Sequence, residues 1–288
     1  MWPGRPATVV VLAWVIAFAA PAFSGCRGEQ ESGSTESSTG LPGLLDRIDA
    51  TGEIHAAYGV YPPYTQEDPN TKAVSGFCVD VLNEIAEQLK VKVVWHRMNW
   101  NTMAADLQRG DFDVIADAIF QTVPRAREYS FTEPYTYFAD GIAVVRKGET
   151  RFATFESLDD KSITISVGLG WASETLVRAR LSSPKVLTVQ TTTDLLQVFN
   201  EVMAGRADAA IVDGADARRF VAEHPDEFEA LWLDAPPAYM PAGFALRLDD
   251  RTGTEFLNVS LRNLRATGIL KALANKHKIP SSDVPFPG

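Results

Sequence analysis

The segment 113–135 carries residue types that could hold a small zwitterion: an arginine, several acids and several aromatic side chains. Pro124 and Arg125 follow shortly after the apolar run 114–119, which predicts a strand buried on both faces of a parallel sheet. Ligands of open α/β sheets bind at the carboxyl ends of strands, and a guanidinium placed there can grip a carboxylate through two parallel hydrogen bonds. The alternative is that Arg125 and Arg127 are solvated charges at the start of a surface helix.

The segments that must position such a site alternate between strand and helix patterns. This alternation predicts an α/β chain with parallel sheets and helical crossovers. Short apolar runs predict the strands, and amphipathic stretches predict the helices. The strand-like segments are 53–60, 91–95, 141–146, 163–167, 186–189, 209–212 and 243–247, and the helical ones are 79–89, 101–108 and 193–204.

The first part of the chain has the pattern of an export signal. Arg5 precedes an apolar stretch, residues 7–23, that is marginal for a membrane-spanning helix but has the length of a secretory signal. Small residues then precede Cys26, as in a lipobox, although Phe23 stands where leucine is more usual. We therefore expect residues 1–25 to be a lipoprotein signal peptide and Cys26 to be lipidated. The alternative is an uncleaved anchor helix, and in both cases the folded part lies outside the cytoplasm.

Composition separates a polar tether from a large folded region. Residues 27–40 are rich in Ser, Gly, Thr and Glu, so we expect 26–44 to form a lipidated, flexible tether. The chain is 45% hydrophobic with a mean hydropathy of −0.07, which suffices for one large domain or two lobes. A net charge of −10 and a pI near 5.0 argue against nucleic acid and against electrostatic binding to anionic lipid.

The remaining reactive side chains indicate neither a metal nor a cofactor. The sequence contains no phosphate-binding glycine loop and no serine nucleophile elbow. Cys78 lies at a strand-to-helix entry, where we expect a small buried hydrophobe, and with Cys26 lipidated no disulfide is expected. The histidines are scattered without the spacing of a helical zinc motif: His55, His96, His224 and His277.

Several short motifs occur in an order and at spacings that resemble one family. They are Tyr61-Pro62-Pro63-Tyr64, Gly76-Phe77, Trp100, the set Asp113, Ile115, Thr122, Arg125, Phe131, Thr132, Pro134 and Tyr135, then 170–174, Gly205-Arg206, Asp208-Ala209 and Asp213. Over roughly residues 53–275 the chain is similar to the extracellular solute-binding proteins of the polar amino acid ABC-uptake family. The resemblance implies a two-lobed, type II periplasmic-binding-protein fold, in which two parallel or mixed sheets are joined by a two-strand hinge around a ligand cleft. It implies lobe 1 at 45–143 and 244–288, and lobe 2 at 144–243.

The same resemblance gives roles to individual residues. Arg125 would hold a ligand carboxylate, and Asp213 would hold an ammonium group unless it serves as a helix N-cap. Tyr61, Trp100 and Tyr64 would sandwich the ligand body, although Trp100 and Tyr64 could instead be packing residues of the core or rim. The expected ligand-binding set is Tyr61, Tyr64, Trp100, Asp117, Ala118, Phe120, Arg125, Gly170, Trp171, Ala172 and Asp213.

Four positions depart from the family pattern. Phe120 and Ala172 stand where hydroxyl donors to the ligand carboxylate are usual, Trp171 adds aromatic surface, and Asp117 adds an acid. Aromatic walls with two acids suit a cation, because ring faces attract ammonium by about 0.5–2 kcal/mol. We therefore expect a ligand with a pronounced cationic or aromatic part, while Asp117 could instead pair with Arg125 in the open form.

The resemblance implies the substrate-binding lipoprotein of an ABC importer rather than an enzyme. As a monomer, it would capture an amino acid or a related amine-bearing molecule and deliver it to a membrane permease and its ATPase. An enzyme similar to cyclohexadienyl dehydratase, which has the same fold, is one alternative, with Glu174 and Asp213 as candidate acids. A ligand-sensing ectodomain that acts through a separate partner is another.

Overall fold

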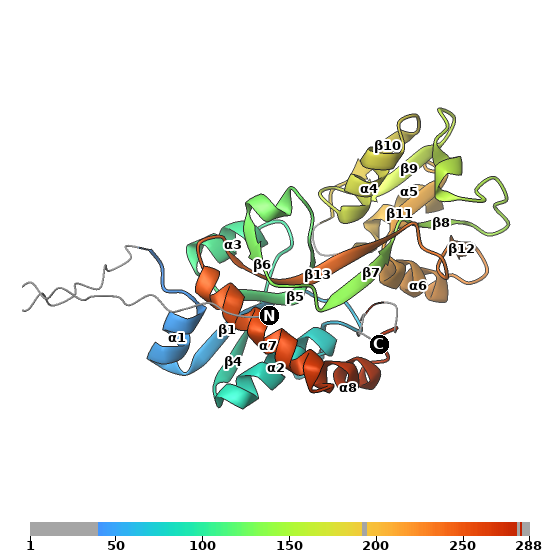
Figure 1. The fold of residues 1–288 in the computed structure, drawn as a ribbon. Helices are drawn as coiled ribbons and strands as arrows, with labels where there is room; N and C mark the ends of the chain where they lie inside the picture. Colours follow the sequence, from blue (N-terminus) through green and yellow to red (C-terminus); the bar gives the residue numbers. More distant parts are fainter. Residues whose placement is uncertain (1–39, 192–194, 281–282, 284–288) are drawn as a thin grey trace, which may run out of the picture. The chain divides into compact units, whose positions relative to one another are not determined.

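Two mixed sheets form the framework of the folded region. The computed structural model describes residues 40–191, 195–280 and 283, and Figure 1 shows how the elements are arranged. Each of the two larger sheets has helices on its faces, and a small third sheet pairs β2 (Gln66–Glu67) with β3 (Val74–Ser75). This arrangement of sheets and helices is an α/β fold.

The first sheet combines parallel strands with a long antiparallel one. Strand β1 pairs in parallel with both β4 and β5, whereas β13 runs antiparallel to β5, β6 and β7. The order along the sheet is β4-β1-β5-β13-β6, with β7 also paired to β13. The strands are β1 (Glu53–Tyr58), β4 (Lys92–Arg97), β5 (Val114–Phe120), β6 (Tyr129–Phe131), β7 (Thr136–Asp140) and β13 (Ala238–Arg247).

Both faces of the first sheet are covered, which explains the continuous apolar run of β5. Ala116 and Ala118 pack into a cluster with residues of α2, α7 and α8, while Ile115 and Ile119 pack on the other face with residues of α3. All of β5 is buried except Phe120, as expected for a strand covered on both sides. The helices are α1 (Leu44–Thr51), α2 (Phe77–Leu89), α3 (Met103–Arg109), α7 (Arg251–Ala266) and α8 (Ile269–Lys276).

The second sheet is built in the same way. Its order is β10-β9-β11-β8-β12, with β9 parallel to β10 and β11, and β8 antiparallel to β11 and β12. Apolar side chains of its two faces pack into two separate clusters. The elements are β8 (Ile142–Arg146), η2 (Phe155–Leu158), β9 (Thr164–Gly168), α4 (Ala172–Arg180), β10 (Lys185–Val189), η3 (Leu195–Val198), α5 (Phe199–Met203), β11 (Ala209–Val212), α6 (Gly214–Glu223) and β12 (Phe228–Leu231).

The chain passes from the first sheet to the second at Asp140 and Gly141. Strand β7 ends at Asp140 in the first sheet and β8 begins at Ile142 in the second. Gly141 between them has φ 81°, a left-handed conformation that favours glycine. The return crossing lies before Ala238, because β13 is paired within the first sheet from that residue onward.

Most predicted elements occur, with shifted ends. The predicted strand 243–247 is the second half of β13, which begins earlier, at Ala238, and pairs with β7 from that residue. The predicted helix 193–204 is a 3-10 turn, η3, followed by the short α5, and residues 192–194 lie outside the described part. Element ends depend on which distant strand supplies a hydrogen-bond partner, and local periodicity does not contain that information.

Among the described residues, no helix has both the length and the apolar character that a membrane crossing requires. The predicted signal peptide, Cys26 and most of the predicted tether lie outside the described residues. The division into lobes at particular residues stays a prediction.

Candidate functional site

A pocket lies where parallel strands of both sheets end. The loops after β1, β4 and β5 contribute to it from the first sheet, and the segments after β9 and β11 contribute from the second. This is the strand-end position at which open α/β sheets bind ligands. About 530 Å³ of space, open on one side to solvent, is lined by Tyr61, Trp100, Ala118, Ile119, Phe120, Arg125, Trp171, Ala172, Ser173, Asp213 and Asp216.

Two glycines let the tryptophans of the pocket lie against the backbone. The indole of Trp100 lies so close to Gly59, just after β1, that a Cβ on this residue would overlap the ring. The indole of Trp171 lies in the same way against Gly168, the last residue of β9. Each ring is therefore held beside a strand end of its own sheet, which places both tryptophans in the pocket.

An aromatic cluster supports Tyr61 and Phe120 from below the pocket surface. Phe138 has ring-centroid distances of 4.7 Å to Phe120 and 5.6 Å to Tyr61. Tyr64 stacks on Tyr61 at 5.5 Å and packs against Phe138 at 4.4 Å. Offset and tilted rings at such distances attract one another, so the cluster holds the two lining rings in place.

Arg125 presents its guanidinium to the pocket with only neutral partners. Its Nη1 donates to the Phe120 carbonyl at 3.2 Å, and its Nη2 donates to the Gly170 carbonyl at 3.4 Å. Within the described part of the chain, no carboxylate lies at ion-pair distance from it, and burial lowers the pKa of Arg125 from its ordinary value. A positive charge in this setting is suited to an incoming anion.

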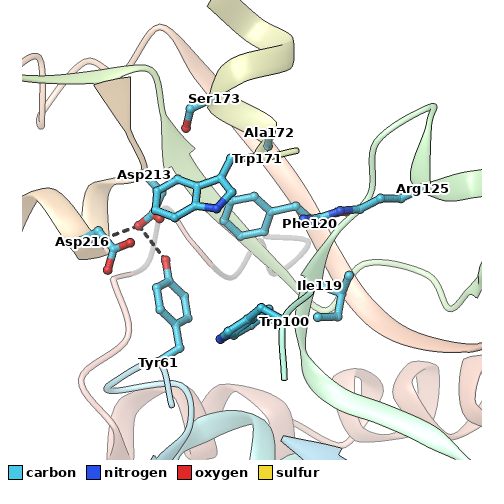
Figure 2. A pocket seen from close by; sticks show the side chains of 11 residues that line it. Tyr61, Trp100, Ile119, Phe120, Arg125, Trp171, Ala172, Ser173, Asp213 and Asp216 are labelled. Atoms are coloured by element: carbon cyan, nitrogen blue, oxygen red, sulfur yellow. Dashed lines mark hydrogen bonds between the residues drawn. The ribbon is translucent and has the colours of Figure 1, made fainter. Parts of the chain in front are cut away.

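Asp213 is both the N-cap of α6 and a pocket residue. Its Oδ1 accepts hydrogen bonds from the backbone N–H groups of Ala215, at 2.8 Å, and Asp216, at 3.0 Å. The same oxygen accepts a hydrogen bond of 2.6 Å from the Tyr61 hydroxyl, drawn in Figure 2. Burial raises the pKa of Asp213, while these donors oppose the rise. Asp213 is therefore the N-cap that one interpretation predicted, and it also lines the pocket, while its binding of an ammonium group stays a prediction.

Asp117 and Tyr64 do not line the pocket. Asp117 is fully buried and accepts hydrogen bonds from Gly59 N, Thr65 Oγ1 and its neighbouring amide, Ala118 N. In this structure Asp117 forms no ion pair with Arg125. Burial raises its pKa to about 6. Its role in this structure is to hold the loop that follows β1.

Tyr64 is buried beneath Tyr61, and its hydroxyl donates to Asp283 Oδ2 at 2.9 Å. Gly170 is not among the lining residues, and its carbonyl accepts a hydrogen bond from Arg125 Nη2. Ala118, Phe120, Trp171 and Ala172 line the pocket, as do Tyr61, Trp100, Arg125 and Asp213. Whether these residues bind a ligand stays a prediction.

Three lining residues were not predicted from the sequence: Ile119, Ser173 and Asp216. Ser173 and Asp216 lie in the first turns of α4 and α6, next to predicted residues, and helix starts at strand ends are a recurring ligand position. Ile119 lies in β5 between two residues that were predicted, Ala118 and Phe120, and this position is the signal in the sequence that could have identified it.

Other polar groups lie apart from the pocket. Cys78 is a free, buried thiol in the first turn of α2, and burial raises its pKa, so it has the packing role expected of it. The candidate acid Glu174 accepts from Gly170 N at 2.8 Å and pairs with Arg178, outside the pocket lining. No cluster of three or more potential metal-ligating side chains occurs within residues 40–191, 195–280 and 283.

The fold and the pocket together define a class of protein. Two mixed α/β sheets with a pocket at their strand ends constitute the two-lobed type II periplasmic-binding fold. The sequence matches the family described as "Bacterial extracellular solute-binding proteins, family 3" over residues 54–279. The chain belongs to this family.

Individual proteins that are similar to this chain carry several different names. A "Probable amino-acid ABC transporter-binding protein" of Haemophilus influenzae is 30% identical over 80% of this chain and 86% of its own length. A "Cyclohexadienyl dehydratase" of Pseudomonas aeruginosa is 28% identical over 63% of this chain and 67% of its own length. The solved "arginine-bound form of truncated (residues 20-233) ArgBP from T. maritima" is 30% identical with a TM-score of 0.62, covering 76% of this chain and 99% of that one.

Proposed function

We propose that this chain captures an amino acid or a related amine-bearing small molecule as the substrate-binding component of an ABC importer. The observation that carries the proposal is the presence of a cation and an acid in one pocket: Arg125 and Asp213 both line it, from segments that follow strands of different sheets. In Figure 2 Asp213 lies on the left, beside Asp216, and Arg125 lies on the right, with Trp171 and Phe120 between them. A zwitterion would place its carboxylate at Arg125 and its ammonium at Asp213.

Hydrogen-bond capacity supports these roles. The guanidinium of Arg125 uses only neutral carbonyls as partners, so a carboxylate would supply the charged acceptor. At Asp213, all three donors from the described residues act on Oδ1, which leaves Oδ2 for a ligand ammonium. Each charge-assisted hydrogen bond contributes about 1.5–3 kcal/mol.

The character of the other walls favours a ligand with a cationic part. The rings of Tyr61, Trp100, Phe120 and Trp171 surround the space, and ring faces attract ammonium or guanidinium groups. Phe120 and Ala172 offer no hydroxyl to a carboxylate, so the anionic end depends mainly on Arg125. The similar solved structure described above is named as arginine-bound, and arginine has such a cationic part, which supports this expectation.

The mode of action follows from the position of the pocket. Arg125 follows β5 of the first sheet, and Asp213 follows β11 of the second. A ligand that bonds both would favour a closed arrangement of the two predicted lobes, 45–143 with 244–288 and 144–243. The closed protein would then present its ligand to a membrane permease and its ATPase. It would act as a monomer outside the cytoplasm, anchored through lipid on Cys26.

A thermal-shift screen tests the proposal. The purified protein would be heated with amino acids, polyamines and quaternary amines, and a ligand that binds the folded state raises the melting temperature by mass action. We expect amino acids with a free carboxylate and ammonium to stabilise the wild type and to lose this effect in Arg125→Met and in Asp213→Asn. Absence of a shift with every amine, or a shift that both variants retain, would contradict the proposal.

The relative named cyclohexadienyl dehydratase makes catalysis the second candidate. We propose that this chain is not an enzyme, because Glu174, one of the two candidate acids, is paired with Arg178 outside the pocket lining. Incubation with prephenate and with arogenate, followed by chromatography, decides between the two: turnover that is lost in Asp213→Asn would establish the enzyme.

A further inference from the structure

Asp140 is a buried acid at the crossing between the sheets that has one oxygen without a partner. Its Oδ1 accepts hydrogen bonds from Gly141 N at 2.7 Å and from Ser173 Oγ at 2.5 Å. Its Oδ2 is buried and has no hydrogen-bond partner within the described residues. A buried polar atom without a partner is costly, so this carboxylate calls for an explanation beyond the stability of the fold.

The bond from Ser173 changes what the pocket offers to a ligand. Ser173 lines the pocket, and its single hydroxyl hydrogen is directed to Asp140. A hydroxyl has one donor hydrogen and two acceptor lone pairs. The Ser173 oxygen can therefore act toward the pocket only as an acceptor, and it adds to the acceptor oxygen of Asp213 on the same side.

The charges on this side of the pocket exceed what one ammonium can balance. Asp216 is paired with Arg219 at 2.8 Å, whereas Asp140 and Asp213 have no cationic partner at ion-pair distance within the described part. Arg218, on the same helix as Asp216, is exposed to solvent. Asp140 lies close enough to Asp213 for the negative charge of Asp213 to add to the burial that raises the pKa of Asp140. Asp213 in the pocket lining and Asp140 behind Ser173 are therefore two neighbouring acids beside a ligand whose carboxylate would be balanced by Arg125.

We propose that Asp140 is a specificity-determining residue that acts through Ser173 and its own charge to select ligands carrying a second positive charge. The ligand class is an amino acid with a guanidinium or ammonium side chain and a net charge of +1. This inference rests on the proposed amino-acid binding and deepens it. Asp140 is a positioning residue, because Ser173 and not Asp140 lines the pocket.

Matched ligand pairs test the proposal by isothermal titration of the purified protein. Arginine is compared with citrulline, which has the same length and a neutral end, and lysine with norleucine. We expect the wild type to bind arginine or lysine at least about 10-fold more tightly than its neutral counterpart, because charge-assisted hydrogen bonds are about twice as strong as neutral ones.

Two variants separate the charge from the acceptor. Asp140→Asn keeps an oxygen for Ser173 and Gly141 but removes the charge, and Ser173→Ala removes the acceptor and keeps the charge. Each should lower the preference for the cationic ligand several-fold, while affinity for the neutral partner stays within about 3-fold. Asp160 is an exposed acid whose side chain accepts hydrogen bonds from Ser162, so Asp160→Asn is the control for net charge and should retain the wild-type preference.

The outcomes distinguish this proposal from the one on which it rests. If the wild type binds amino acids without preferring the cationic member of each pair, or if both variants retain the preference, the role of Asp140 is refuted and amino-acid binding stands. If the wild type binds no amino acid, the proposed function itself fails. Should Asp140→Asn not fold, the Ser173→Ala result decides, because this substitution leaves the bond from Gly141 to Asp140 in place.

Discussion

The hydroxyl of Tyr61 donates a 2.6 Å hydrogen bond to Oδ1 of Asp213, and this bond connects the loop after β1 of the first sheet to the start of α6, which follows β11 of the second. Both groups are buried, and both line the pocket. The bond therefore links the two sheets at the position where we propose that a ligand ammonium binds. The ligand-free protein therefore already has a contact between the two sheets at Asp213 Oδ1, and a bound ammonium would add a second contact at Asp213 Oδ2.

Replacement of Tyr61 by Phe measures this contact. The ring and its stacking on Tyr64 remain, but Asp213 loses one of three donors, so we expect the free energy of unfolding of the ligand-free protein to fall by about 1–2 kcal/mol. Urea denaturation provides the measurement. Tyr137→Phe is the matched control, because the Tyr137 hydroxyl has no hydrogen bond to the described residues, and it should change stability by less than about 0.5 kcal/mol. Equal losses in both variants would contradict the importance of the bond.

Arg125→Met should abolish most of the affinity for carboxylate-bearing ligands. Loss of the charge-assisted hydrogen bonds corresponds to about 10- to 100-fold weaker binding, measured by titration with the ligand found in the thermal screen. Arg127 belongs to the same 3-10 turn, Arg125–Arg127, and is exposed outside the pocket lining. Arg127→Met therefore should bind as the wild type does. If Arg127→Met were the weaker binder, Arg125 would not be the carboxylate site.

Gly59→Ala should weaken binding through Trp100. A Cβ at this position overlaps the indole, so the ring must leave its place in the pocket, and we expect affinity to drop by roughly 10-fold with the loss of one aromatic wall. A double-mutant cycle provides the test. In a Trp100→Ala background the overlap no longer exists, and Gly59→Ala should then have little further effect on affinity. Additive losses in the cycle would show that Gly59 acts by another route.

The free energy of unfolding of Asp117→Asn should exceed that of the wild type by more at high pH than at low pH. Burial raises the pKa of Asp117 from 3.8 to about 6, so between these values the folded state holds a proton that the unfolded chain releases. The contribution of Asp117 to the free energy of unfolding therefore falls as the pH rises through this window, and the full cost is present above it.

Asparagine does not titrate, so the stability difference between Asp117→Asn and wild type should rise by about 2 kcal/mol from pH 4 to pH 8. Urea denaturation of both proteins at the two pH values gives this difference directly. A difference that is independent of pH would mean that Asp117 stays ionised throughout the window.

Local patterns in the sequence were sufficient for much of the fold. The apolar run of β5 predicted a strand buried on both faces, and the amphipathic pattern 79–89 predicted α2, which begins two residues earlier than expected, at Phe77. Arg125 was predicted at a strand end because it follows that run, and it lies in the pocket. These features depend on burial and on the spacing of neighbouring residues, which the sequence displays.

Polar pairs between distant segments were decided only by the tertiary structure. The sequence places Asp117 and Phe120 on one strand, but only the packing of the loop after β1 turns Asp117 into an acceptor for Gly59 and leaves Phe120 in the pocket. Likewise, Asp140 and Ser173 are brought together by the crossing from β7 to β8 and the start of α4. A hydrogen bond requires donor and acceptor within about 3 Å and in line, and this geometry between remote segments arises only when the sheets and helices have packed.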